Sequence, residues 1–229
     1  MTVVVKLGSS LVTDGNGRAR RALLAARAAD IAAIVAGGES ACIVSSGAIA
    51  LGTPLLGLER RPRATPQLQA ASAAGQVKLQ LAWEAALRGE GLRTAQVLLS
   101  AGDLAERASY VNARNALRAL LKLGVIPVIN ENDATATDEI TFGDNDALAA
   151  QVAVLLGARL LVLLTEVDGV HSAHPAEPGA EPLASGDAVE LVALDGTALG
   201  KGIAGAGADE LRSRPRGVEA VHRDRLVLY

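Results

Sequence analysis

Two clusters of hydrogen-bonding side chains are the part of this chain whose residue types and spacing point most directly to chemistry. The first is Asn-Glu-Asn-Asp at residues 130–133, and the second is Gly-Asp-Asn-Asp at residues 143–146. Carboxylates and amides in such clusters can bind an ammonium group or orient a neighbouring cation. Helix capping is the alternative, above all for Asp144, whereas Asp133 and Asn145 have no evident capping role.

A second candidate site is the segment Lys-Leu-Gly-Ser-Ser at residues 6–10. A lysine at a turn of small residues can contact phosphate oxygens through its ammonium group and through unobstructed backbone N–H groups. A solvated lysine at a strand end is the simpler alternative. The chain has only four lysines, so one at such a turn gives weight to the phosphate interpretation, and both remain open.

Other polar residues carry less specific signals. The segment Ser-Ser-Gly-Ala at residues 45–48 can bind an anion or cap a helix with equal ease. We expect the arginines of residues 60–63 to be solvated in a loop, and Cys42, inside an apolar strand, to be a core residue. The histidines at positions 171 and 174 lack further ligands at suitable spacing, so no metal site is expected there.

The elements that must position these clusters follow from hydrophobic periodicity. Apolar runs rich in β-branched residues predict strands at residues 2–5, 41–44, 94–99, 125–129 and 160–164. Helical spacing predicts helices at residues 20–36, 66–88 (with Thr65 as N-cap), 100–123 and from 144 onward. This alternation is typical of a three-layer α/β/α sandwich with a mostly parallel central sheet.

The carboxyl ends of parallel strands meet at one rim of the sheet, which is where α/β proteins bind ligands. Four of the expected strands end in polar or glycine-rich segments, namely KLGSS, SSGA, NEND and TEVDG. Their convergence on one rim predicts a binding site more strongly than any one motif does.

After residue 169 the pattern is weaker. Residues 173–187, rich in proline, glycine, alanine and glutamate, predict a surface loop or lid, and residues 196–207 predict a glycine-rich loop. Short strands are expected near residues 189–194, 218–221 and 226–229. We expect residues 1–229 to form a single domain.

The composition excludes several classes of protein. The 229 residues are 50% hydrophobic but only 2% aromatic, so the core must be aliphatic. A net charge of -3 argues against a nucleic-acid partner, and a single cysteine excludes an internal disulfide framework and fits a reducing compartment. No signal peptide and no apolar run of membrane-spanning length is evident. We therefore expect a soluble, cytoplasmic protein that binds no membrane.

Seven segments, in this order and spacing, resemble the glutamate 5-kinases (gamma-glutamyl kinases) of the amino acid kinase family. They are VVVKLGSS, IVSSGAIALG, ASAAGQ, YVNARNALRALL, VIPVINENDA, FGDNDALAA and LLVLLTEVDGV. The resemblance runs from about residue 3 to residue 175. INEND followed by GDND is specific within that family, whereas the KxGSS start is shared with its other branches.

The resemblance implies an amino acid kinase-like α/β/α fold and a defined reaction. The γ-phosphoryl group of ATP would pass to the side-chain carboxylate of L-glutamate, giving L-glutamyl 5-phosphate in the first step of proline biosynthesis. Mg²⁺ would be held mainly through the ATP phosphates, with no direct protein ligands. The resemblance also implies small-molecule substrates and a homo-oligomer.

The resemblance also assigns roles by position. Lys6 would be the catalytic lysine, oriented by the carboxylate of Asp146. The nucleotide would be contacted by Lys6, Gly8, Ser9, Thr165, Glu166, Lys201 and Gly202. Glutamate would be bound by Ser46, Asp133 and Asn145.

The chain departs from the family pattern after residue 198. The family's nucleotide loop resembles GLGTGGMxTK and ends in a second lysine, whereas this chain has ALGKGIAGAGADEL and no lysine after Lys201. No RNA-binding-like C-terminal domain is expected. Two alternatives therefore stay open: a catalytically impaired relative that binds glutamate or nucleotide, and a sibling kinase with another acceptor. The pair NEND and GDND favours an amino-acid acceptor over the latter.

Overall fold

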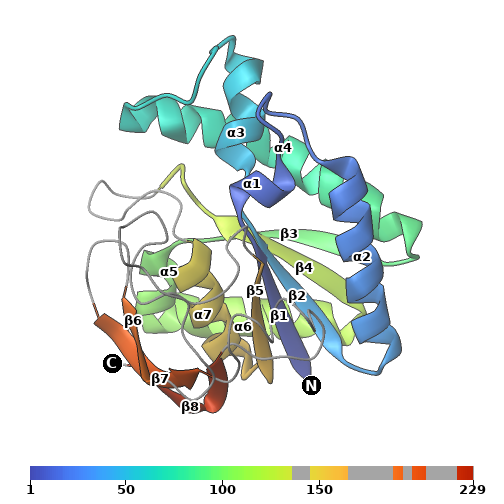
Figure 1. Cartoon of the computed structure of the whole chain (residues 1–229), viewed down its shortest axis with the longest axis vertical. Helices are drawn as coiled ribbons and strands as arrows, with labels where there is room; N and C mark the ends of the chain where they lie inside the picture. The colour runs from blue at the N-terminus through green and yellow to red at the C-terminus, as the bar shows by residue number, and fades with distance from the viewer. Residues whose placement is uncertain (136–144, 165–187, 193–197, 205–220, 229) are drawn as a thin grey trace. The chain divides into compact units, whose positions relative to one another are not determined.

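The computed structural model describes residues 1–135, 145–164, 188–192, 198–204 and 221–228, the last three ranges by their backbone (Figure 1). The chain divides into two compact units, Met1–Leu164 and Thr165–Tyr229.

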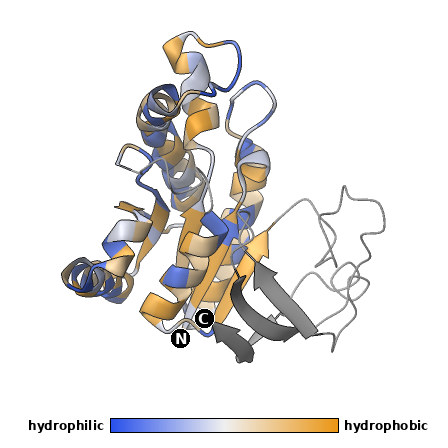
Figure 2. Ribbon diagram, turned by 90° about the vertical axis from the view of Figure 1, so that its left-hand side faces the viewer, coloured by the Kyte–Doolittle hydropathy of each residue, from blue (hydrophilic) through white to orange (hydrophobic). Residues whose placement is uncertain are grey.

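The first unit is built on a five-stranded sheet with the order β3-β4-β2-β1-β5. All four strand pairings are parallel. The strands are β1 (Thr2–Leu7), β2 (Ser40–Ser45), β3 (Arg93–Leu99), β4 (Val125–Glu131) and β5 (Leu160–Leu164). The central strands β1, β2 and β4 are largely apolar and mostly buried (Figure 2), because helices cover both faces of the sheet.

Long helices cover both faces of this sheet and give the three-layer arrangement that the sequence predicted. Helices α2 (Arg21–Ala36) and α4 (Thr65–Gly89) pack on one face, and α6 (Arg107–Lys122) and α7 (Asn145–Leu156) pack on the other. Shorter helices are α1 (Ser9–Val12), α3 (Ala48–Gly52), α5 (Ala101–Ala105) and the 3-10 helix η1 (Thr53–Leu56). None of the described helices is long and apolar enough to cross a membrane.

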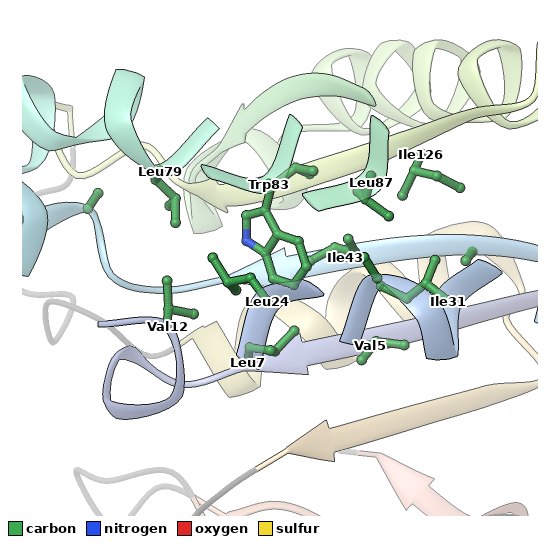
Figure 3. Packing of buried hydrophobic residues seen from close by; sticks show 14 of the residues in the cluster. Val5, Leu7, Val12, Leu24, Ile31, Ile43, Leu79, Trp83, Leu87 and Ile126 are labelled. Carbon is green, nitrogen blue, oxygen red and sulfur yellow. The ribbon is translucent and has the colours of Figure 1, made fainter. Parts of the chain in front are cut away.

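The core between the sheet and helices α2 and α4 is centred on Trp83 of α4. Figure 3 shows its indole ring directed toward Leu24 of α2 and Ile43 of β2, and all three side chains are fully buried. Successive residues of a strand point to opposite faces, so Val3 and Val5 belong to this core while Val4 belongs to the other.

The core on the opposite face is aliphatic. It joins Val4 and Cys42 of the sheet to Leu117 of α6 and Val152 of α7. The Cys42 thiol is fully buried, and burial raises its pKa far above the ordinary value. Cys42 is therefore a core residue, as the sequence predicted.

Three local details differ from the sequence expectations. The strand β4 continues through Asn130 and Glu131, which pair with Leu98 and Leu99 of β3, so the polar cluster begins inside the sheet. Thr65 is the first residue of α4 and not its cap. The predicted helix 100–123 is broken at Glu106, whose extended backbone ends α5 and whose carboxylate caps α6.

The second unit contains a three-stranded antiparallel sheet with the order β6-β7-β8. The strands are β6 (Ala188–Val192), β7 (Ala198–Ala204) and β8 (Val221–Leu228). The glycine-rich stretch expected to be a loop is thus the central strand β7, where pairing on both edges outweighs the low strand propensity of glycine. The two expected terminal strands form one strand, β8. Residues 173–187, expected as a loop or lid, lie outside the described residues.

Candidate active site

The candidate site lies at the carboxyl rim of the larger sheet. Parallel register sets Leu7, the last residue of β1, beside Ser45 of β2 and beside Leu164 of β5. The segments that follow Leu7 and Ser45 therefore start side by side, and the backbone N–H of Ser46 donates to the carbonyl of Leu7 over 3.0 Å. The predicted convergence of strand ends is confirmed for β1, β2 and β4.

A lysine–aspartate ion pair stands at this rim. Lys6 Nζ lies 2.5 Å from Asp146 Oδ1. The lysine side chain is 12% exposed and the aspartate side chain 56%. The Asp146 carboxylate therefore lies on the solvent side of the Lys6 ammonium group. The two residues come from β1 and from the first turn of α7, far apart in sequence. The ion pair restrains the position of the lysine head group.

Gly8, in the turn after β1, lies beside the lysine head group. A Cβ atom at position 8 would lie 3.8 Å from Lys6 Nζ, and Gly8 has none. Helix α1 begins at Ser9, immediately beyond this glycine. An ammonium group next to bare backbone fits the oxygens of a phosphate, which prefer N–H donors and positive charge.

A second group of side chains, from β2, β4 and α7, is linked by hydrogen bonds. Asn145 Nδ2 donates to Ser46 Oγ over 2.7 Å and to Asn130 Oδ1 over 3.0 Å. Ser46, Asn130 and Asn145 are all buried. Gly47, which follows Ser46, has a φ of 117°, and a Cβ there would lie 3.0 Å from Val12 Cγ1. Only glycine allows the chain to turn so sharply from β2 into α3.

Asp133 is the buried carboxylate of this group, with 5% of its surface exposed. Ser72 Oγ of α4 donates to Asp133 Oδ2 over 2.5 Å. Desolvation raises the pKa of the Asp133 carboxyl, although the Ser72 hydrogen bond and the positive charge of Arg61 act in the opposite direction. Among the described residues, the hydrogen bond to Asp133 comes from a neutral hydroxyl, so this buried carboxylate is suited to bind a cationic group of a ligand.

A pocket joins these residues. It is lined by Ser9, Ser46, Gly47, Ala48, Ile49, Arg61, Asn130, Asp133 and Asn145. The structure thus brings together the three residues predicted for glutamate, and one of those predicted for phosphate, Ser9. Arg61 is exposed in a loop, as the sequence predicted, and it also lines the pocket.

Sequence reasoning also missed the contribution of α4. Ser72 holds Asp133, and Gln76 Oε1 accepts a hydrogen bond of 2.8 Å from Asn130 Nδ2. Both lie in the segment ASAAGQ, noted only for its resemblance. Buried polar residues four apart on one helix, Ser72 and Gln76, were the signal that could have revealed them.

The remaining predicted nucleotide residues belong to the second unit. Thr165 and Glu166 lie outside the described residues. Lys201 and Gly202 lie on β7 of the second unit, opposite Glu190 and Val189 of β6. Within the described residues, no three His, Cys, Asp or Glu side chains are grouped so as to hold a metal ion.

Comparison with known proteins agrees with the fold. Residues 1–211 match the amino acid kinase family, which is most of the chain. The chain belongs to the amino acid kinase family. A curated family member with the name glutamate 5-kinase, from Sphingopyxis alaskensis, is 48% identical over 208 residues, covering 89% of this chain and 56% of that protein.

Two further relatives in the amino acid kinase family are also named glutamate 5-kinase. The protein from Ralstonia nicotianae is 49% identical over 87% of this chain and 55% of its own length. The protein from Cereibacter sphaeroides is 51% identical over 78% of this chain and 48% of its own length. The chain therefore spans about half the length of the curated relatives it matches.

Proposed function

We propose that this protein transfers the γ-phosphoryl group of ATP to the side-chain carboxylate of L-glutamate, giving L-glutamyl 5-phosphate and ADP. The observation that carries the proposal is the identity of about half the residues to proteins named glutamate 5-kinase over most of this chain. The pocket that joins Ser46, Asp133 and Asn145 to Ser9, three residues after Lys6, supports it. The product would enter proline biosynthesis.

The reaction requires little acid–base catalysis from the protein. A glutamate carboxylate is already ionised near pH 7, so its oxygen can attack the γ-phosphorus directly. One oxygen–phosphorus bond forms while the bond to the ADP oxygen breaks, and no proton moves. Catalysis then rests on positioning and on neutralising the charge of the transferred group.

The residues of the lysine turn have the chemistry for that neutralisation. Lys6 would approach the phosphoryl oxygens, and Asp146, 2.5 Å from its ammonium nitrogen, would hold the lysine in place. The backbone N–H groups of Gly8 and Ser9 would donate to the same oxygens. Thr165, Glu166, Lys201 and Gly202 are proposed nucleotide contacts by position alone.

The pocket would hold the amino-acid acceptor. The Asp133 carboxylate, which is buried and has Ser72 as its neutral donor, would bind the α-ammonium group. Ser46 and Asn145, joined by a hydrogen bond of 2.7 Å, would complete the contacts to glutamate. Glutamate would thus be bound by residues at the ends of β2 and β4 and at the start of α7, and the phosphoryl group by residues at the end of β1.

Mg²⁺ is the metal that this chemistry implies. The ion would be held mainly by the ATP phosphates. It would neutralise charge on the phosphate oxygens, while Asp146 remains committed to Lys6.

We also propose a cytoplasmic homo-oligomer in which residues 1–229 act as one kinase domain. The aliphatic side chains of Val77 and Leu81, one turn apart on α4, are 62% and 56% exposed. Contact between copies would remove these side chains from water. The small-molecule substrates would be glutamate and ATP, with no nucleic acid and no membrane bound.

The test is turnover of ATP and Mg²⁺ with glutamate in the presence of hydroxylamine, which traps the acyl phosphate as a hydroxamate. Glutamate should give hydroxamate, and aspartate, one methylene shorter, should give far less. Equal turnover of both would contradict the assigned acceptor. Binding of glutamate without turnover would favour the alternative of a catalytically impaired relative.

A further inference from the structure

Arg61 brings a positive charge to the candidate pocket. It lies in the loop between η1 and α4, where its side chain is exposed. The rest of the pocket lining consists of neutral residues and one carboxylate, that of Asp133. Among the described residues that line this pocket, Arg61 is therefore the one with a cationic side chain, and the proposed contacts to glutamate do not include it.

The Arg61 charge lies near the Asp133 carboxylate but is not paired with it. Desolvation raises the pKa of the Asp133 carboxyl, whereas the Ser72 hydrogen bond and then the Arg61 charge lower it. Within the described part of the chain, the Arg61 guanidinium takes part in no ion pair and no hydrogen bond. Two opposite charges thus line one pocket, and each can bind an oppositely charged group of a ligand.

The local sequence restricts the conformations that Arg61 can adopt. Pro62 follows it, and the residue before a proline is confined mainly to extended conformations. The loop ends at α4, the helix whose Ser72 donates to Asp133. The same helix therefore anchors both the loop that carries the cation and the side chain that carries the anion.

We propose that Arg61 binds the α-carboxylate of the amino-acid acceptor. The inference rests on the proposed function, because it concerns the same acceptor at the same pocket. The ammonium and carboxylate groups of an α-amino acid are attached to one carbon, so their partners must be two neighbouring groups of opposite charge. Asp133 and Arg61 are such a pair. A guanidinium binds a carboxylate through two parallel N–H donors, which adds orientation to affinity.

The side-chain carboxylate of glutamate is a poorer match for Arg61. That group must attack the γ-phosphorus, so it has to lie toward Ser9 and Lys6. A carboxylate held by a guanidinium would also be a weaker nucleophile, since its negative charge would be neutralised. Binding of the α-carboxylate by Arg61 would instead orient the acceptor and leave its reactive carboxylate unpaired.

Isoglutamine, the α-amide of glutamate, tests this contact, because it keeps the ammonium group and the side-chain carboxylate and lacks the charge of the α-carboxylate. In calorimetric titrations, the wild type should bind glutamate about tenfold more tightly than isoglutamine. This is the lower end of the range for a hydrogen bond to a charged group, because Arg61 is exposed. Arg61→Met should lose this preference through weaker binding of glutamate, while the affinity for isoglutamine stays nearly unchanged.

Arg60→Met and Arg63→Met are the matched controls. Both arginines are exposed in the same loop and carry the same charge, but neither is among the residues that line the pocket. Both variants should keep the preference of the wild type for glutamate. A preference that survives in Arg61→Met, or that either control loses equally, would overturn the proposal. A higher KM for ATP in Arg61→Met, with glutamate affinity intact, would also overturn it, because Arg61 would then contact the nucleotide.

Binding and turnover together separate this inference from the proposed function. If the wild type binds glutamate through Arg61 but forms no hydroxamate, the proposed reaction is wrong and the contact stands. If the wild type forms hydroxamate but binds glutamate and isoglutamine equally well, the contact is wrong and the reaction stands. A wild type that binds neither ligand would overturn both.

Discussion

The indole nitrogen of Trp83 donates a hydrogen bond to Ser45 Oγ over 2.9 Å, and both residues are fully buried. Trp83 lies on α4, and Ser45 is the last residue of β2. The Ser45 hydroxyl in turn donates to the carbonyl of Ser46, at the edge of the candidate pocket, over 3.1 Å. The hydrophobic core on α4 is thus directly linked to the strand end that carries Ser46.

This link predicts a measurable cost for Trp83→Phe. The change removes a hydrogen bond and part of a fully buried ring, so the free energy of unfolding should fall by about 1–3 kcal/mol. Urea unfolding followed by circular dichroism measures it, since the variant lacks the single tryptophan of the chain. A double-mutant cycle with Ser45→Ala should show coupling between the two positions; strictly additive effects would mean that the hydrogen bond contributes nothing.

Two glycines allow α3 and α4 to pack backbone against backbone. A Cβ at Gly75 would lie 1.9 Å from the carbonyl oxygen of Ala48, and one at Gly52 would lie 1.8 Å from that of Ala71. Gly75→Ala must push α3 away. Because Ala48 and Ile49 of α3 line the pocket, the variant should lose about 1–3 kcal/mol of stability and bind glutamate more weakly.

Gly89→Ala is the control for this prediction. Gly89 ends the same helix, α4, and a Cβ there would meet nothing within 4 Å. The substitution should change the free energy of unfolding by less than about 0.5 kcal/mol or stabilise the protein slightly. If Gly75→Ala were as well tolerated as Gly89→Ala in urea unfolding and glutamate titration, close packing of α3 on α4 would not matter to the site.

The fold could be predicted because the sequence patterns that indicate its strands and helices are local. Apolar runs such as residues 160–164 and 41–44 carry strand propensity themselves, and their alternation with helices fixes a parallel, three-layer arrangement. The strand β7 was missed because its sequence, ALGKGIA, is poor in strand formers and is held by pairing to β6 and β8. Partners distant in sequence cannot be identified from a local pattern.

The candidate site was predictable in part for the same reason. Asp133, Asn145 and Ser46 lie at the ends of strands or helices, where clustered polar residues indicate a binding site. Gln76 and Ser72 lie in the middle of a 25-residue helix, and only contacts across 54 and 61 residues reveal their roles. Tertiary packing alone turns that helix face toward the pocket.

The ion pair of Lys6 with Asp146 predicts an effect on turnover rather than on glutamate binding. If Lys6 neutralises charge that develops during phosphoryl transfer, Lys6→Ala should lower kcat by roughly 10²–10³-fold. Glutamate affinity measured by calorimetry should barely change. Lys78→Ala, at an exposed position of α4, should leave both quantities unchanged. A large loss of glutamate affinity with kcat intact would place Lys6 in the acceptor pocket instead.

The raised pKa of Asp133 predicts a pH dependence of glutamate binding. Desolvation raises the pKa of this carboxyl above its ordinary value of 3.8, so on acidification Asp133 becomes neutral earlier than an exposed aspartate would. Only the ionised form attracts an ammonium group. The KM for glutamate should therefore rise as the pH falls toward the raised pKa, while the KM for ATP stays level.

Asp133→Asn tests that assignment, since it removes the titrating group. Its KM for glutamate should be higher than that of the wild type, by the equivalent of about 2–5 kcal/mol, and level between pH 5.5 and pH 8. The range stays above the side-chain pKa of free glutamate, about 4.3. A KM for glutamate in Asp133→Asn equal to that of the wild type would show that another group holds the ammonium.

The last prediction concerns the second lysine that the family pattern leads one to expect and this sequence lacks. Lys201 is the last lysine of the chain, and it lies on the central strand β7, paired in register with Glu190 and Val227. A strand paired on both sides holds its backbone rigidly, so Lys201 can take the role of the missing lysine only if β7 itself lies at the phosphates.

If Lys201 takes this role, Lys201→Ala should lower kcat at least tenfold, since contacts to a transferring phosphoryl group are of that size or larger. Lys122→Ala, at an exposed position near the end of α6, is the matched control and should have no effect. Ala206→Lys or Gly207→Lys, which restores a lysine at the family position outside the described residues, should raise kcat. Unchanged kcat in Lys201→Ala together with no gain from either added lysine would mean that Lys6 alone supplies the lysine charge to the reaction.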